Sequence, residues 1–257
     1  MTPRSEPTTL FAPPSLALRG LRVAREPGAT PQNTINWCLS AGARAVQLDA
    51  AMPGLRPREL SGGERRGLAA FVARSGAAVS GVDLFIPPEH FTSAAHVDRA
   101  VGALADAIGF ASDLGRVVVG TRLPAEAAPD VVKEIEHAAA RSGVVVADHA
   151  FPPRAMGDGA FLQVGIDAAS ALLGAQSIEA VILSLARPPA AARLTDVGPT
   201  GPVAPGAGRL DVLAFVSALA ARRYAGFLVA DLSGIADQAT AAAKALAATP
   251  TAESLGG

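Results

Sequence analysis

The chain has 257 residues, of which 50% are hydrophobic, and its formal net charge at pH 7 is −1. This length suits a single α/β barrel with a sizeable core, and the hydrophobic content argues against disorder of the main body. The sequence has no long basic run, which argues against nucleic acid as the main partner, and no run of about 18 apolar residues that would predict a membrane span. Cys38 is the only cysteine, so an internal disulfide and a cysteine-based metal cluster are excluded.

The two ends of the chain differ from its middle. The first 15 residues, MTPRSEPTTLFAPPS, are rich in Pro, Ser and Thr and lack the apolar core of a signal peptide. We therefore expect a flexible N-terminal arm at residues 1–15, a cytoplasmic protein as the default, and a frayed tail at residues 249–257. The folded domain is predicted to cover residues 16–248.

Within that domain, short apolar runs alternate with helical patterns. Strands are predicted at residues 16–24, 43–49, 77–87, 116–120, 143–151, 161–167, 190–197 and 224–231. Helices are predicted at residues 31–40, 58–75, 92–114, 125–142, 175–186, 210–223 and 234–248, the first with Thr30 as its N-cap and Pro31 at its first position. Only residues 150–160 separate the fifth strand from the sixth, which is too few for a full helix. The pattern predicts a single-domain (β/α)₈ TIM barrel with a shortened crossover between strands five and six.

Three of the predicted strands run from apolar residues into an aspartate: Asp148, Asp167 and Asp231. Strands that are apolar on both faces are typical of a parallel sheet, and the carboxyl ends of barrel strands meet at the rim that holds active sites. One such aspartate could be a helix N-cap, but three at the same rim favour a site. His149 follows Asp148 and faces the opposite side if the strand continues. Asp49 also ends a strand.

Other features carry weaker signals. His90, in the segment IPPEHF after the third strand, could reach the barrel mouth, or it could be an ordinary loop histidine. The loop Pro205–Gly208 (PGAG) could present backbone N–H groups to a phosphate, although tight turning explains its glycines equally well. Both lysines, Lys133 and Lys244, fall inside helical patterns, which disfavours a Schiff-base aldolase.

The order of motifs resembles the sugar phosphate isomerase/epimerase family, whose members are xylose isomerase-like barrels. The resemblance runs from about Leu16 to Leu246 and rests on VVVADHAF, VGIDAAS, ARLTDV and the long segment APGAGRLDVLAFVSALAARRYAGFLVADL. It implies an isomerase or epimerase that acts on a sugar or sugar phosphate by moving a proton next to a carbonyl. A homo-oligomer is compatible with it.

The resemblance also implies one divalent cation, Mn²⁺, Mg²⁺, Co²⁺ or Zn²⁺, held by Glu, Asp, His and Glu on strands five to eight. Carried onto this sequence, the metal ligands are Asp148, Asp167 and Asp231, and Asp148 and Asp231 form the acid/base pair. Arg193 stands where the family has its histidine ligand. Ser170 and Thr195 replace a usual His and Lys, while Asp196 keeps the family's Asp.

The arginine is the main departure from the family pattern. A guanidinium group has no lone pair to give to a metal and stays protonated, whereas it readily pairs with carboxylates. Two hypotheses follow: an active isomerase or epimerase, or a catalytically degenerate barrel that binds a small polyol, phosphate or acid without turnover. The substrate-binding candidates are Arg193, His149, Asp196, Asp49 and His90. A multi-metal phosphodiesterase is disfavoured because the chain has only four histidines.

Overall fold

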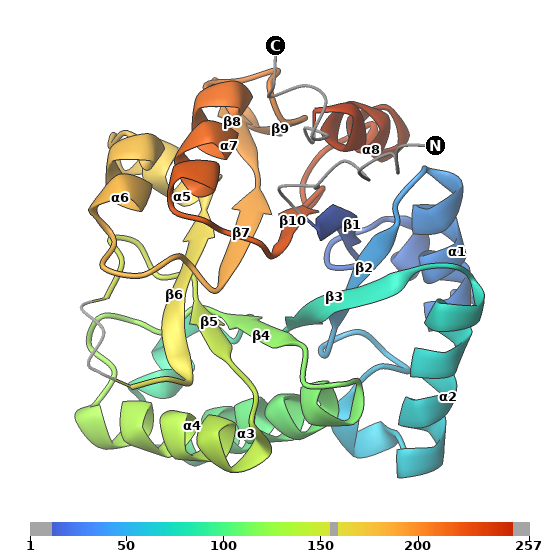
Figure 1. Ribbon diagram of the computed structural model, residues 1–257. Coiled ribbons are helices and arrows are strands. Elements are labelled where there is room, and N and C mark those ends of the chain that lie inside the picture. The colour runs from blue at the N-terminus through green and yellow to red at the C-terminus, as the bar shows by residue number, and fades with distance from the viewer. Residues whose placement is uncertain (1–11, 155–158, 249–257) are drawn as a thin grey trace, which may run out of the picture.

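The computed structural model describes residues 12–154 and 159–248, and eight parallel strands close a barrel within them (Figure 1). Around the barrel the strand order is β1-β10-β7-β6-β5-β4-β3-β2. These strands are β1 (Ala12–Ala17), β2 (Ala45–Asp49), β3 (Ala78–Asp83), β4 (Val118–Thr121), β5 (Val146–Asp148), β6 (Leu162–Asp167), β7 (Ala191–Leu194) and β10 (Phe227–Ala230). The predicted (β/α)₈ barrel is confirmed.

The part of the chain that the structure describes contains eight α-helices, and helices surround the strands (Figure 1). They are α1 (Pro31–Ser40), α2 (Gly62–Arg74), α3 (Val97–Asp113), α4 (Pro129–Ser142), α5 (Ala168–Leu173), α6 (Ile178–Ser184), α7 (Val212–Ala221) and α8 (Gln238–Ala247). Short 3₁₀ turns at Val23–Arg25, Pro57–Glu59 and Pro88–Phe91 precede α1, α2 and α3. The Thr30 side chain accepts a hydrogen bond from the backbone N–H of Asn33, which confirms the predicted cap of α1. None of the described helices is long and apolar enough to cross a membrane.

Several boundaries differ from the prediction. β1 starts at Ala12, four residues before the expected domain boundary, and it ends at Ala17 rather than at residue 24. Residues 12–15 of the arm expected at 1–15 therefore belong to β1, whereas residues 1–11 of that arm and the expected tail at residues 249–257 lie outside the described residues. The helix predicted at residues 175–186 is the shorter α6, which begins after its N-cap Ser177, and an additional short helix that was not predicted, α5, precedes it and ends at its C-cap Gly174.

The region after β7 also differs. The predicted strand at residues 190–197 stops at Leu194, and the following segment forms a separate two-stranded antiparallel sheet of β8 (Asp196–Gly198) and β9 (Gly201–Val203). Gly201 has a φ of +130°, a conformation that favours glycine and permits the tight turn between these strands. Between β5 and β6, the described residues 149–154 and 159–161 contain no helix, as the shortened crossover predicted.

The barrel has an apolar layer outside its strands and a polar interior. Outward-facing residues such as Leu16, Val46 and Ile166 are buried against the helices. Inside, the hydroxyls of Ser15 and Ser80 lie 2.7 Å apart and are buried. This polar interior leads upward to the charged cluster at the carboxyl ends of the strands.

Candidate functional site at the barrel mouth

Arg193 occupies the centre of the site. It extends from β7 into the barrel, and only 2% of its surface is exposed. Its Nη1 donates to both carboxylate oxygens of Asp83, at 2.8 and 2.7 Å, and its Nη2 donates to Oδ2 of Asp231 at 2.6 Å. Two carboxylates, one at the end of β3 and one just after β10, therefore share one guanidinium group, an arrangement that holds its orientation rigidly.

The two carboxylates have different environments. Asp83 is fully buried, and burial raises its pKa to about 6 even though Arg193 opposes this shift. Its other partner is Gln47, whose Nε2 donates to Oδ1 at 2.6 Å. Burial also acts to raise the pKa of Asp231, but Arg193, the backbone N–H of Ser233 and Arg19 together hold it below the ordinary value. The ionic form is therefore favoured more strongly at Asp231 than at Asp83.

An aromatic ring and a second arginine lie beside this ion pair. The guanidinium carbons of Arg19 and Arg193 lie 4.7 and 5.1 Å from the ring centroid of Phe85, within cation–π range. Arg19 also pairs with Oδ2 of Asp231 at 3.3 Å while 41% of its side chain remains exposed. Arg19 thus connects the buried cluster to solvent.

His149 is the residue of the β5 end that faces the barrel interior. It is 1% exposed, and neither ring nitrogen has a hydrogen-bond partner among the described residues. Burial, followed by the charge of Arg193, lowers the pKa of His149 to about 3, so the imidazole is neutral at pH 7.

Two glycines make room for these inward side chains. A Cβ added at Gly165 on β6 would lie 2.8 Å from three atoms of the His149 ring. A Cβ added at Gly120 on β4 would lie 2.6 Å from Oδ1 of Asp83. Both distances are shorter than real contacts allow, so the interior cluster requires glycine at both positions.

Asp148 lies apart from Arg193. Its Oδ1 accepts hydrogen bonds from the backbone N–H groups of Leu123 and Ala150, each at 3.0 Å, and its Oδ2 lies 3.4 Å from Nε of Arg154. Burial raises its pKa despite these bonds. Asp148 therefore ties the end of β5 to the loops after β4 and β5, whereas its neighbour His149 faces the interior.

Asp167 belongs to a separate polar network at the rim. Its Oδ1 accepts from the Thr195 hydroxyl at 2.5 Å, and its Oδ2 accepts from Arg122 at 2.9 Å and from Ser170 at 3.1 Å. The side chains of Arg122 and Asp167 are 42% and 13% exposed. Ser170 and Thr195 thus both hold Asp167 in place.

Asp196 organises the loop that follows it. Its two carboxylate oxygens accept hydrogen bonds from five backbone N–H groups, at 2.7 to 3.0 Å, which belong to Val197, Gly206, Gly208, Arg209 and Leu210. The N–H groups of Gly206 and Gly208, which belong to the loop Pro205–Gly208, donate to this carboxylate rather than being free to bind a phosphate. Asp196 is 2% exposed and serves as the anchor of the loop.

The last two candidates lie at the edges of the site. Asp49 is half-buried, its Oδ1 accepts from the backbone N–H of Ala51, and burial raises its pKa. Its charge interacts with Arg19, Asp231 and Arg193, which places it beside the cluster. His90 lies in the 3₁₀ turn after β3 with its ring centroid 4.9 Å from that of His96, and no contact joins it to Arg193 among the described residues.

Sequence reasoning missed four residues of the candidate site: Asp83, Gln47 and Arg19 of the Arg193 cluster, and Arg122 of the Asp167 network. Asp83 and Gln47 lie inside predicted strands rather than at their ends. A charged or amide residue within an otherwise apolar strand was the one sign in the sequence that could have identified them. Arg19 and Arg122 follow the ends of β1 and β4 and have no motif around them.

This arrangement does not fit the divalent cation that the resemblance implies. The described residues contain no group of three or more His, Cys, Asp or Glu side chains that could hold a metal ion. Asp148, Asp167 and Asp231 are each held by different partners, and the fixed charge of Arg193 stands between Asp83 and Asp231. A dication within a few ångströms of that guanidinium would experience a repulsion of several kcal/mol unless water screened it.

Comparisons with known proteins find similarity of structure. No protein-family model and no curated protein sequence matches the chain. A xylose isomerase domain protein from Planctomyces limnophilus has a TM-score of 0.69 and 16% identity, over 92% of this chain and 95% of its own. A D-psicose 3-epimerase solved in the presence of D-fructose has a TM-score of 0.68 and 16% identity, over 92% and 96%.

The D-psicose 3-epimerase from Clostridium cellulolyticum H10, solved with D-tagatose, has a TM-score of 0.67 and 14% identity, over 92% of this chain and 96% of its own. These likenesses extend over nearly the whole of each chain at low identity. The chain therefore has the xylose isomerase-like TIM-barrel fold, which it shares with these isomerase-domain and epimerase structures.

Proposed function

We propose that this protein binds a sugar-like polyol at the C-terminal rim of its barrel without a divalent metal ion. The observation that carries the proposal is the position of Arg193, whose guanidinium pairs with Asp83 and Asp231 at the centre of the barrel. The positive charge that the resemblance assigns to a metal is supplied in this arrangement by a side chain.

The ligand is expected to contact the partly exposed residues above this cluster. Arg19 and Arg122 are 41% and 42% exposed, and Asp49 and Asp167 are partly exposed beside them. Carboxylate and guanidinium groups each offer two hydrogen-bonding atoms in a plane, which suits neighbouring hydroxyl groups. The ketoses D-fructose and D-tagatose, present in two structures of the same fold, are therefore the first ligands to test.

The proposal assigns binding rather than proton transfer. Proton transfer between Asp148 and Asp231 requires both carboxylates within hydrogen-bond reach of one substrate. Asp148 is instead bonded to backbone N–H groups of its own loops, and Asp231 is bonded to Arg193 and Arg19. In this proposal both aspartates have structural roles. The competing isomerase hypothesis predicts turnover, which the same experiment measures.

The test uses chelator-treated protein and a panel of ketoses, aldoses and their phosphates. We expect at least one compound to raise the melting temperature, with the same shift before and after addition of Mn²⁺ and with no turnover. The variant Arg122→Gln should weaken that binding about tenfold, the cost of one charged hydrogen bond. Arg141→Gln, an exposed arginine at the end of α4, is the matched control. A panel without any shift, a shift only with Mn²⁺, or turnover would each contradict the proposal.

A further inference from the structure

Arginines gather at the end of the barrel that lies opposite the mouth. We call this end the amino-terminal face, because the parallel strands all begin there. In the described residues, six connections lead from a helix into the next barrel strand at this face, at residues 41–44, 75–77, 114–117, 143–145, 185–190 and 222–226. Each has at least one arginine, either within it or in the last two residues of the helix before it. These arginines are Arg44, Arg74, Arg116, Arg141, Arg187, Arg222 and Arg223.

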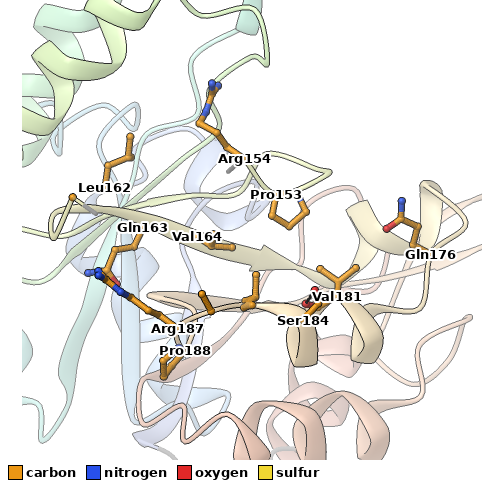
Figure 2. A pocket seen from close by; sticks show the side chains of 13 residues that line it. Pro153, Arg154, Leu162, Gln163, Val164, Gln176, Val181, Ser184, Arg187 and Pro188 are labelled. Atoms are coloured by element: carbon orange, nitrogen blue, oxygen red, sulfur yellow. Dashed lines mark hydrogen bonds between the residues drawn. The ribbon is translucent and has the colours of Figure 1, made fainter. Parts of the chain in front are cut away.

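The side chains of these arginines are available to a partner. All but the half-buried Arg222 are exposed, and none of the seven forms an ion pair among the described residues. A Cβ added at Gly143 would lie 3.3 Å from Nε of Arg116, so the arginine of one connection extends to the next connection around the barrel. Figure 2 shows Arg187 beside Gln163, near the start of β6 and therefore at the same face.

Acidic residues are few at this face. In the connections and the last two turns of the helices before them, the described acids are Asp113, which pairs with Arg65, and Glu136 and Glu179. The sequence outside the described ranges adds three acids and Arg4. Even with all of these at the amino-terminal face, nine arginines would stand against six acids. The chain as a whole has a net charge of −1, so the positive charge of this face comes from where the arginines are placed.

The ends of the helices account for only part of this pattern. A cation in the last turn of a helix stabilises it through the helix dipole, and Arg74 and Arg141 stand in such positions. Arg44, Arg116 and Arg187 lie three or four residues beyond the ends of their helices, where this effect has decayed. Arg116 also has a φ of +62°, a conformation that favours glycine. Helix stability therefore does not explain why arginine stands at these three positions.

We infer that the amino-terminal face binds the surface of a membrane rich in anionic phospholipids. Arginine pairs bidentately with phosphate groups, and clusters of about four to eight basic residues are typical of sites for anionic lipids. The six connections are short and lie around one closed ring, so their arginines are spread over a broad face rather than along a line. This distribution suits a planar membrane better than a strand or duplex of nucleic acid. Bound in this way, the protein would direct its mouth away from the membrane, so the inference does not depend on the polyol proposal.

The test measures co-sedimentation of the full chain with lipid vesicles at low ionic strength. We expect binding to phosphatidylcholine vesicles that contain about one third phosphatidylserine, release by added NaCl, and no binding to phosphatidylcholine alone. The double variant Arg74→Gln, Arg116→Gln should weaken the binding about thirtyfold, since each arginine near an anionic membrane contributes about fivefold. Its polyol-induced shift in melting temperature should be unchanged, because the mouth is at the other end of the barrel.

The double variant Arg25→Gln, Arg209→Gln is the matched control. Both arginines are exposed, neither forms an ion pair among the described residues, and both lie in segments between a strand and the following helix, at the mouth end. This variant has the same net charge as the first and should bind vesicles as the unchanged protein does. Absence of binding to the anionic vesicles, or equal weakening in the two double variants, would overturn the inference. Binding to a DNA duplex as tight as to the anionic vesicles, at equal phosphate concentration, would also overturn it. None of these results would bear on polyol binding.

Discussion

Replacing Arg193 with Met should strongly destabilise the fold. Methionine keeps much of the length of the side chain but removes its charge. Asp231 would retain Arg19 at 3.3 Å and the backbone N–H of Ser233 at 2.8 Å, whereas Asp83 would retain only the amide of Gln47. Removing one partner of a buried ion pair typically costs about 3–5 kcal/mol because the other charge stays buried. We expect Arg193→Met to lower the free energy of unfolding by about this amount at pH 8, measured by urea denaturation.

The loss should depend on pH with a definite sign. The pKa of Asp83 is about 6 because of burial, and Arg193 is the main influence that lowers it. Without Arg193 the pKa rises further, so the folded variant binds a proton more tightly than the unfolded chain does. A carboxyl group of this kind stabilises the fold as the pH falls. The cost of Arg193→Met should therefore be smaller at pH 5 than at pH 8.

Asp83→Asn provides the matched control for this variant. In the Arg193→Met background it removes the unpaired charge, so it should restore part of the lost stability, whereas alone it should destabilise. Solvent-exposed ion pairs typically contribute less than about 1 kcal/mol. The buried-pair explanation would therefore be refuted if Arg193→Met cost less than about 1 kcal/mol at pH 8, or if Asp83→Asn restored none of the lost stability.

Three further changes test the surrounding residues. The pKa of His149 is about 3 in the folded protein, against 6.5 when the ring is solvated, so between pH 7 and pH 5 the unfolded chain binds a proton at this residue and the folded chain does not. This difference lowers the free energy of unfolding by about 2 kcal/mol. In His149→Leu, urea denaturation at the two pH values should not show this decrease. Gly165→Ala should lower the free energy of unfolding by about 1–3 kcal/mol because the added methyl group contacts the His149 ring. In a double variant, His149→Ala should relieve most of that cost; a double variant that keeps the full cost would contradict this contact. Asp196→Asn replaces a carboxylate oxygen with an amide N–H donor that faces backbone N–H groups, so it should lower the free energy of unfolding by about 1–3 kcal/mol. Residues 199–210 should then be cleaved faster by proteases. An unchanged rate of proteolysis would contradict the role of Asp196 as the anchor of this loop.

Much of the fold could be predicted because its pattern is local. Strands apolar on both faces, such as VVVAD before His149, differ clearly from the helical repeats between them. The Thr30-Pro31 start of α1 was also visible, since an N-cap and a first-turn proline act within one turn. The hairpin of β8 and β9 was not, because its Pro and Gly residues are equally typical of an irregular loop.

For the candidate site, the sequence allowed only the placement of aspartates at the carboxyl ends of the strands. The sequence pattern favoured aspartates at strand ends. Adjacent residues of a strand face opposite sides, so a shift of one position decides whether Asp148 or His149 faces the barrel interior. The structure turns His149 inward. The pairing of Asp83 with Arg193 could not be predicted because the two residues are 110 positions apart in the chain, and only the closed barrel brings them together. The departure at Arg193 was nevertheless readable from the motif alone.

The central claim is that Arg193, rather than a divalent ion, supplies the positive charge at the barrel centre. Calorimetric titration of Mn²⁺ into chelator-treated protein tests it most directly, with Asp231→Asn as the matched variant. We expect no stoichiometric binding of Mn²⁺ in either protein. One Mn²⁺ bound per chain, and lost in Asp231→Asn, would contradict it.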